Sequence, residues 1–381
     1  MHCKKYLFFM LFFLILLFPL YGGVLDYFCP PLKGVIVQEQ APQFTLSGAL
    51  DGSYQTDAGT FFEQSMPGKN ALLRLRGETI YSLLRTSPNN YVLRGKDDYL
   101  FEIEYLQDYF QMTPPVSREK TDALSVQLQN LQKKLTQAGK ELYIYITPSK
   151  TRFFPDKAPR TSVLAGKKTR DTDSYENLLA SLKNTDLQVF DGVSYLQQNE
   201  GTMQSPLFYA SGIHWSRVWA AKATAAFNEY MRQTSGYDLA QVTVGEVPTE
   251  KPTAQDADLY DMCNLISAPK EQYYDPTLSF TPGSEQPKVL IQGGSFSFGL
   301  WNTLGYTGEF AKTDYLENTL HQSYTAETQE FTNQTITSFD DMKLEQYVED
   351  ADIVILEVNE MRIDEMSFGL LDYLEQNWSP S

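Results

Sequence analysis

The sequence has few of the residues that bind metals or form disulfides. It contains three histidines and three cysteines among 381 residues. Cys3, Cys29 and Cys263 form no CxxC pair and have no spacing typical of a metal site. We therefore predict no metal site, no cofactor and no disulfide framework, although the sequence is compatible with a Cys29–Cys263 disulfide.

Net positive charge is also absent. The formal net charge of −17 argues against nucleic acid or an anionic membrane surface as a partner. A polysaccharide remains compatible with this charge, since 24 Tyr and 23 Phe can supply aromatic platforms. With 42% hydrophobic and 13% aromatic residues, the composition is that of a folded globular protein.

Only one apolar run is of membrane length, and it lies in residues 1–25. Lys4 and Lys5 precede about twenty uncharged residues that end at Asp26, which is enough to span a bilayer. Basic residues before the span predict a cytoplasmic N-terminus and an extracytoplasmic remainder. A cleaved signal peptide is the alternative, and the protein would then be secreted. The site after Gly23 fits the small-x-small rule poorly, so we favour an anchor.

The rest of the chain divides into an extension, residues 26–90, and one domain, residues 91–381. The extension is first rich in Pro, Gly and Gln and then predicts a helix over Met66–Leu84. The domain begins with a predicted hairpin, Tyr91–Leu93 and Tyr99–Ile103, and then alternates strands with helices. Helices are predicted at Val116–Lys140, Asp173–Leu182, Arg217–Arg232 and Glu365–Gln376, and strands at Leu142–Ile146, 187–193, 288–292 and Asp352–Leu356. This alternation predicts an α/β domain in which helices flank a parallel sheet.

The segment KVLIQGGSFSFGL contains the candidate nucleophile. Val289, Leu290 and Ile291 predict a buried strand, and two glycines then allow a tight turn into a helix that would begin near Ser295. A serine on such a turn presents its hydroxyl at the sheet edge, and the first backbone N–H groups of the helix form an oxyanion hole. The same Gly-Gly-Ser sequence also occurs in ordinary turns.

His214 is the candidate base. Imidazole is the side chain best matched to proton transfer at neutral pH. His2 belongs to the membrane segment, and His321 lies in a polar stretch typical of a surface. His214 follows small and polar residues and precedes a helix that Ser216 would cap, so it lies on a connection, where functional side chains concentrate. An aromatic-flanked histidine that only packs a loop is the alternative.

Polar side chains also follow two other predicted strands. Lys150 comes after the strand Leu142–Ile146, and Glu357, Asn359 and Glu360 come after Asp352–Leu356. Ligands of parallel α/β sheets bind beyond the carboxyl ends of the strands. These four residues are therefore substrate-binding candidates, unless they only stabilise the loops.

Together these segments resemble the SGNH-hydrolase-like polysaccharide O-acetyltransferases of the AlgX/AlgJ type. The resemblance extends from about residue 44 to 365 and depends on the shared order of short motifs. They are LRGKDDYLFEIEYLQDY, ITPSKTRFFPDKAP, HW-S at His214, ADLYDM (Ala257–Met262), GGSF at Ser295 and VILEVNE. The resemblance implies an SGNH-like fold and transfer of acetyl groups to polysaccharide hydroxyls outside the cytoplasm. It also implies a membrane-bound O-acyltransferase as the acetyl supplier.

The resemblance assigns Ser295 as nucleophile, His214 as base and the backbone N–H groups of Gly294 and Phe296 as the oxyanion hole. One departure matters, because the family usually has Asp two residues before the histidine and this chain has Gly212. Another acceptor, such as a backbone carbonyl, Glu357 or Glu360, then orients His214, or the site is a Ser-His dyad, or its activity is impaired. A non-catalytic scaffold protein and an acetyl esterase are therefore the alternative functions.

Overall fold

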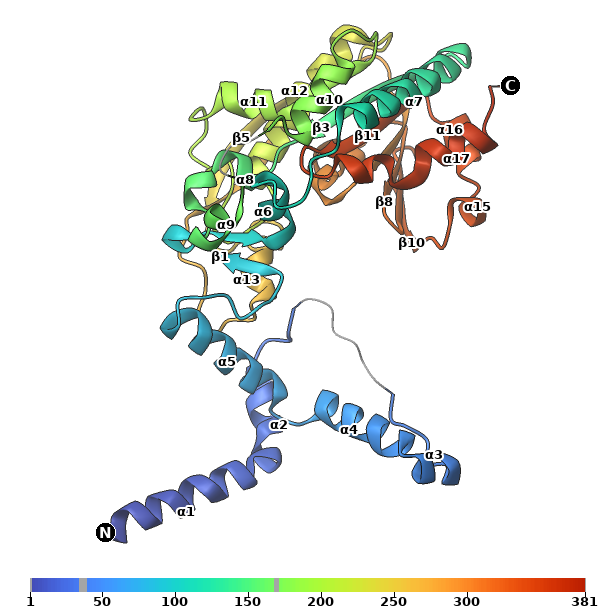
Figure 1. The fold of residues 1–381 in the computed structure, drawn as a ribbon. Coiled ribbons are helices and arrows are strands. Elements are labelled where there is room, and N and C mark those ends of the chain that lie inside the picture. The colour runs from blue at the N-terminus through green and yellow to red at the C-terminus, as the bar shows by residue number, and fades with distance from the viewer. Residues whose placement is uncertain (1, 34–39, 168–170, 381) are drawn as a thin grey trace. The chain divides into compact units, whose positions relative to one another are not determined.

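The computed structural model describes residues 2–33, 40–167 and 171–380 (Figure 1). Met1 and residues 34–39, which belong to the two predicted N-terminal segments, lie outside the described residues. The chain forms two compact units, residues 1–94 with 259–270, and residues 95–258 with 271–381. The sequence predicts that Leu259–Lys270 belongs to the domain from residue 91, whereas this segment is grouped with the first unit in the structure.

The first unit is mainly helical. Its elements are α1 (His2–Leu16), α2 (Phe18–Phe28), α3 (Leu46–Asp51), α4 (Ser53–Ser65), α5 (Lys69–Leu83) and β1 (Val92–Arg94), and it holds all but the first residue of α13 (Asp258–Met262). The Asp26 carboxylate caps α5, because it accepts from the N–H groups of Gly68 at 2.7 Å and Ala71 at 3.0 Å. Arg74 of α5 donates to the carbonyls of Leu265 at 2.8 Å and Pro31 at 2.7 Å, which fastens the 259–270 segment to this unit.

One N-terminal prediction differs from the structure. Among the described residues no single helix is long and apolar enough to cross a membrane. Lys5–Leu16 and Leu20–Phe28 reach that length and composition only as a pair, with a bend of 73° between them. The predicted single spanning helix is therefore not shown. Cys29 and Cys263 are both free thiols, so the Cys29–Cys263 disulfide is not formed.

A seven-stranded sheet forms the centre of the second unit. Its order is β10-β9-β8-β7-β11-β3-β4, and the strands are β3 (Glu141–Thr147), β4 (Gln188–Asp191), β7 (Lys288–Gly293), β8 (Lys312–Glu317), β9 (Leu320–Thr325), β10 (Glu330–Thr335) and β11 (Ile353–Asn359). The strands from β8 to β4 in this order are parallel, as predicted. The β8–β9 and β9–β10 pairs are antiparallel, so the prediction of an all-parallel sheet is wrong at this edge.

Helices cover both faces of the sheet (Figure 1). Alternate residues of β3 point to opposite faces, as the period of a strand requires. Leu142 and Ile144 pack in one core with α7 (Arg118–Gln137), α10 (Ser174–Leu182), α16 (Leu344–Asp350) and α17 (Leu370–Asn377). Tyr143 and Tyr145 pack in the other core with α12 (Arg217–Thr234) and the segment after β7.

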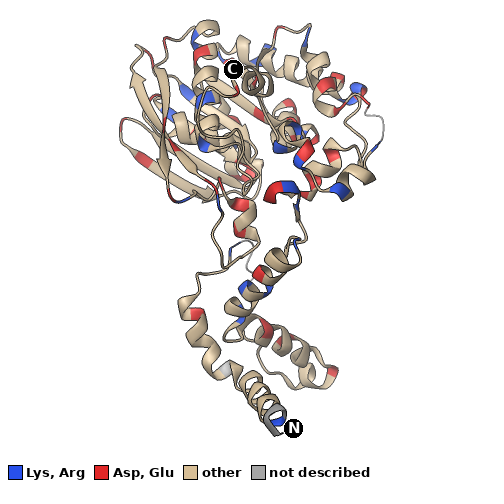
Figure 2. Cartoon of the chain, turned by 90° about the vertical axis from the view of Figure 1, so that its left-hand side faces the viewer, with Lys and Arg blue, Asp and Glu red and all other residues tan. Residues whose placement is uncertain are grey.

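The remaining elements of the second unit are short, apart from one ribbon. The antiparallel ribbon pairs β5 (Gln241–Thr249) with β6 (Tyr273–Thr281). The others are η1 (Lys96–Asp98), β2 (Leu100–Glu102), α6 (Ile103–Tyr109), α8 (Lys150–Phe153), η2 (Pro155–Lys157), α9 (Arg160–Ala165), α11 (Gly192–Asn199), η3 (Ser295–Ser297), α14 (Phe298–Leu300), η4 (Trp301–Gly305), α15 (Phe339–Met342) and η5 (Ile363–Gly369). Acidic and basic residues are interspersed along the elements of this unit (Figure 2).

Two local predictions about the second unit are wrong. The terminal helix begins at Leu370 and not at Glu365, because Met366, Ser367 and Phe368 have non-helical backbone angles. His321 is buried rather than on the surface. Its ring nitrogens lie 3.0 Å from Asp314 Oδ1 and 2.8 Å from Gln334 Nε2, so its polar atoms are satisfied within the β8–β10 sheet edge.

Candidate active site

The structure brings Ser295 and His214 into direct contact. Ser295 follows β7 at the start of η3, and its Oγ lies 2.8 Å from Nε2 of His214. His214 lies on the connection before α12, which Ser216 caps by accepting from the N–H of Trp219. The serine hydroxyl can therefore pass its proton to the imidazole, which is the geometry that general-base activation requires.

Asp258 supplies the orienting carboxylate for His214. Its Oδ2 lies 2.5 Å from Nδ1 of His214, and its Oδ1 accepts from the N–H of Ile213 at 2.8 Å. A carboxylate at Nδ1 keeps the proton on that nitrogen and leaves Nε2 as an acceptor for the serine. The orienting group is thus an acid that position 212 does not supply, as predicted, but it is neither Glu357 nor Glu360.

Gly293 is required where β7 ends. A Cβ at this residue would lie 2.6 Å from Oε2 of Glu357 and 2.9 Å from Cβ of Ser297. Real Cβ contacts are never this short, so a side chain here would displace the Glu357 carboxylate or the turn that carries Ser295. Gly293 therefore allows a close approach of the turn to β11.

Gly212 is required for a different close approach. A Cβ at this residue would lie 2.7 Å from the carbonyl oxygen and 2.9 Å from the carbonyl carbon of Asp256. The backbone of Gln255 and Asp256 therefore occupies the space that a side chain at residue 212 would need. The segment whose backbone excludes a side chain at residue 212 also carries Asp258. This segment therefore supplies the carboxylate that contacts His214 in place of one at residue 212.

We expect Gly212→Asp to lower both stability and activity. The added side chain would meet the Asp256 carbonyl, which leaves no room for it. An overpacked side chain costs about 1–3 kcal/mol, and relief of the clash would move Asp258 away from His214. Urea unfolding and hydrolysis of an activated acetyl ester measure the two effects.

Gly59→Asp is the matched control, because a Cβ at Gly59 meets no atom within 4 Å. Wild-type stability and activity in Gly212→Asp would contradict this prediction. They would show that the backbone near Asp256 can move to accept the side chain without loss of stability.

The predicted oxyanion hole is only partly free. The N–H of Gly294 donates to Oε2 of Glu357 at 2.8 Å, so the assignment of Gly294 is corrected. Among the described residues, none accepts a hydrogen bond from the backbone N–H of Ser295 or Phe296. Both N–H groups belong to the first turn after β7, where the amides have no partner within the helix. The backbone N–H of Phe296 therefore remains a candidate for the oxyanion hole, and the backbone N–H of Ser295 is a second candidate.

The surroundings of His214 favour its protonated form. Burial lowers the pKa of His214, but the Asp258 carboxylate raises it, and the pKa lies above the ordinary value. The Phe296 ring packs beside the imidazole at a centroid distance of 4.7 Å, which helps to exclude water from this side. The base is thus held between a carboxylate and an aromatic ring.

Two of the four substrate-binding candidates line the site. Glu357 and Asn359 contribute to a cavity of about 480 Å³ that also contains Ser295. Glu357 is buried, which raises its pKa to about 7 although the hydrogen bonds from Thr147 and Gly294 lower it. Asn359 donates to the carbonyl of Pro148 at 2.9 Å. Both side chains therefore hold the strand ends together, and neither points freely at a substrate.

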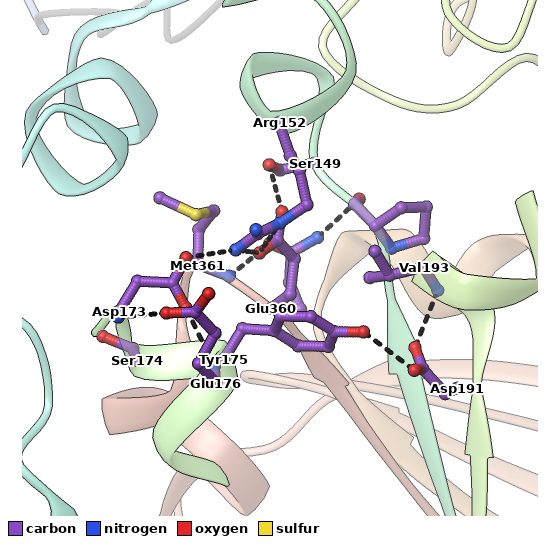
Figure 3. A network of polar contacts seen from close by, with 12 residues as sticks. Ser149, Arg152, Asp173, Ser174, Tyr175, Glu176, Asp191, Val193, Glu360 and Met361 are labelled. Carbon is purple, nitrogen blue, oxygen red and sulfur yellow. Dashed lines mark hydrogen bonds and ion pairs between the residues drawn. The ribbon is translucent and has the colours of Figure 1, made fainter. Parts of the chain in front are cut away.

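The other two candidates are structural. The buried Lys150 ammonium donates to the carbonyls of Leu100, Ala210 and Gly212 at 2.7–2.9 Å, which fixes the loop before His214. Glu360 accepts from Ser149 Oγ and Arg152 Nε, each at 2.6 Å (Figure 3). Both side chains are engaged by contacts inside the protein, so the structure gives no support for Lys150 or Glu360 as substrate-binding residues.

The Arg152–Glu360 pair belongs to a larger polar network (Figure 3). Arg152 also pairs with Asp173 at 2.7 Å, and its guanidinium lies 4.7 Å from the centre of the Tyr175 ring. Burial raises the pKa of Glu360, although the Arg152 charge lowers it. The network joins α8, α10 and the end of β11, so it fixes the strand ends that carry the site.

The described side chains form no cluster that is suited to binding a metal ion. Within residues 2–33, 40–167 and 171–380, no group of three or more His, Cys, Asp and Glu side chains could hold a metal ion.

Comparison with known proteins assigns the family. The model of the SGNH hydrolase-like domain of AlgX acetyltransferases matches residues 92–302, more than half of the chain. The chain belongs to the AlgX family of SGNH hydrolase-like acetyltransferases. The match spans His214, Asp258 and Ser295 and is narrower than the predicted range of about 44 to 365. It leaves out the VILEVNE segment of this AlgX family member.

Solved structures similar to this AlgX family member include three bacterial proteins. The O-acetyltransferase domain of Pseudomonas putida AlgJ is 15% identical, with 74% of this chain and 98% of that chain covered and a TM-score of 0.46. Pseudomonas aeruginosa AlgX is 15% identical, with 75% and 69% covered and a TM-score of 0.44. Bacillus cereus PatB1 with a sulfonyl adduct is 11% identical, with 71% and 94% covered and a TM-score of 0.44. No curated protein matches the sequence.

Three acidic residues of the site were not singled out from the sequence. Asp258 lies in the ADLYDM motif, which contributed to the resemblance without a role for any of its residues. Glu102 and Glu317 line the cavity, at the ends of β2 and β8. A search for carboxylates near strand ends could have found both glutamates in this AlgX family member, but Asp258 depends on how a long loop folds back.

Proposed function

We propose that this protein transfers acetyl groups to hydroxyls of a cell-surface or secreted polysaccharide through Ser295. The observation that carries the proposal is the continuous chain of contacts from Ser295 Oγ through His214 to Asp258 at the wall of a cavity. Membership of the AlgX acetyltransferase family supports acetyl as the transferred group and transfer as the type of reaction.

The first half-reaction would acetylate Ser295. Oγ attacks the carbonyl carbon of an activated acetyl donor while His214 Nε2 takes the hydroxyl proton, and Asp258 stabilises the imidazolium. The negative charge on the carbonyl oxygen is stabilised by the N–H groups of Ser295 and Phe296. His214 then returns its proton to the leaving group, and an acetyl ester remains on Ser295.

The second half-reaction would use a sugar hydroxyl. His214 takes the proton of this hydroxyl while its oxygen attacks the acetyl carbon, and the proton then passes to Ser295 Oγ as the ester bond breaks. One acetyl group is transferred, and the enzyme returns to its starting state. Water in place of the sugar would make the protein an esterase with the same residues.

The cellular setting is part of the proposal. The basic residues Lys4 and Lys5 before an apolar run support an N-terminal anchor with the second unit outside the cytoplasmic membrane, or secretion after cleavage. A membrane-bound O-acyltransferase is the proposed acetyl supplier for such a site. The main argument for a non-catalytic scaffold was the missing carboxylate at residue 212. Asp258 weakens this argument, because its carboxylate contacts His214.

The proposed function is tested by trapping the acetyl-enzyme. The full chain is mixed with an activated acetyl ester, and mass spectrometry of the peptide that contains Ser295 reports a gain of one acetyl group. Appearance of acetyl esters on added oligosaccharides then reports transfer. Absence of acetyl on Ser295, with turnover intact, would contradict the proposal.

We expect the activity to rise with pH through a midpoint above 6.5. The base must be neutral to take a proton, and Asp258 keeps the pKa of His214 above its ordinary value despite burial. The turnover of an uncharged activated acetyl ester between pH 5 and 9 measures this midpoint. A midpoint well below 6.5 would show that burial outweighs the carboxylate.

A further inference from the structure

The cavity beside Ser295 is strongly acidic. Its lining includes five glutamates and one basic residue, namely Glu102, Glu104, Glu317, Glu357, Glu365 and Arg362. The strands place two of these carboxylates on either side of the nucleophile. Glu317 pairs in register with Gly293 at the end of β7, and β11 carries Glu357 on the other side. A substrate that reaches Ser295 therefore passes between carboxylates.

Arg362 balances only part of this charge, and it is already paired with two of the five glutamates. Its guanidinium lies 2.9 Å from Oε2 of Glu104 and also makes an ion pair with Glu365. Glu357 is committed as well, since its two oxygens accept from the Gly294 N–H and the Thr147 hydroxyl. Of the five glutamates, only Glu102 and Glu317 then remain to be considered as carboxylates that could bind a substrate.

Glu102 and Glu317 have no such partners. Within the described ranges, no hydrogen bond or ion pair joins either side chain to another residue. Both are partly buried, and burial raises the pKa of each above the ordinary value. A partly buried carboxylate without a donor is costly, so these two groups have hydrogen-bonding capacity for a molecule in the cavity.

Aromatic rings form another part of the cavity wall. Tyr105 and Phe368 line it, and a Cβ placed on Gly294 would lie 3.6 Å from Cζ of Phe368, so this ring faces the turn before Ser295. Ser367 and Phe368 have positive φ angles of 64° and 47°. Non-glycine residues with positive φ are uncommon and cluster at functional sites. The loop thus holds an apolar ring against the nucleophile turn.

We propose that the acceptor of this site is an uncharged glycan, and that anionic sugars such as uronates are excluded. Sugar hydroxyls donate to Glu102 and Glu317, and the sugar ring packs on Tyr105 or Phe368. A sugar carboxylate would instead meet two unpaired carboxylates at short range, with no free cation among the residues that line the cavity. This inference rests on the proposed function, because it concerns the second substrate of the same site.

The test compares neutral oligosaccharides with their C6-oxidised counterparts. Glucose, mannose and galactose oligomers of one length are paired with the matching uronate oligomers, so that each pair differs only at C6. Binding to the full-length Ser295→Ala variant is measured by calorimetry at 20 and 300 mM salt. We expect the neutral member of a pair to bind at least about tenfold more tightly at low salt, and high salt to reduce this ratio.

Charge variants test which residues discriminate. In Ser295→Ala with Glu102→Gln and Glu317→Gln, the preference for the neutral member should fall about tenfold, because the repulsion of the uronate is lost. Glu330→Gln is the control, since it removes one exposed carboxylate on β10 outside the cavity. Thermal unfolding of each variant shows that the fold is retained.

The outcomes separate this inference from the proposed function. Equal or tighter binding of uronates, or no binding of any neutral oligomer at millimolar concentration, would overturn the uncharged acceptor even if Ser295 becomes acetylated. Failure of Ser295 to become acetylated would overturn the proposed function, while the binding ratio would still decide the charge preference of the cavity.

Discussion

Ser295→Ala and His214→Ala should each abolish acetyl transfer, and by nearly the same factor. The two side chains act as one unit across the 2.8 Å contact between Oγ and Nε2, so losing either one removes the activated nucleophile. In enzymes of this type such changes lower turnover by roughly 10⁴- to 10⁶-fold, and the double variant is scarcely worse than either single variant. Initial rates of acetyl transfer from an activated ester to an oligosaccharide measure the effect.

Ser297→Ala is a useful control for Ser295→Ala. Ser297 lies in the same short helix, but its hydroxyl donates to the Gly294 carbonyl and is buried, so it cannot reach a substrate. We expect it to retain most of the activity. Full activity in Ser295→Ala would end the assignment of the nucleophile, and additive losses in the double variant would show that the pair does not act as a unit.

Asp258→Asn should lower turnover by about 10⁴-fold with little change in fold. The amide can keep Oδ1 on the N–H of Ile213, which leaves its NH₂ group facing Nδ1 of His214. Nδ1 must then accept, the proton moves to Nε2, and the imidazole can no longer take the Ser295 proton. Loss of the carboxylate should also move the pH midpoint of the remaining activity downward, because Asp258 raises the pKa of His214.

The control for Asp258→Asn is Asp186→Asn, which makes the same chemical change at an exposed residue. A loss of turnover below about tenfold in Asp258→Asn would indicate a Ser-His dyad, in which the carboxylate has little part. A large loss without any shift of the pH midpoint would point to a structural defect in the His214 loop.

The sequence predicts those parts of the site that depend on local structure. The strand before Ser295 is an uninterrupted apolar run, the glycines mark the turn, and Ser216 caps the helix after His214. Each of these signals involves neighbouring residues, so propensity and pattern are sufficient. The contact between Ser295 and His214 joins residues that are 81 positions apart, so it depends on how the loop before α12 packs.

The differences between the sequence predictions and the structure concern features that only tertiary packing decides. Lys150 and Glu360 have the polar side chains of a binding site, but the direction of a side chain after a strand depends on what packs against it. The β10 strand is exposed along its whole length, so it lacks the alternation of apolar and polar residues that predicts a half-buried strand. Asp258 is 44 residues from His214, and no local signal joins them.

The close packing of Gly212 on the Asp256 backbone also bears on how related sequences are sorted. A carboxylate at position 212 and the present course of the 256–258 segment exclude each other, since they occupy the same space. The two positions should therefore vary together among relatives, with glycine at the first when the acid comes from the second. A motif search that demands Asp two residues before the histidine would discard this chain as inactive, although its His214 has a carboxylate partner at 2.5 Å.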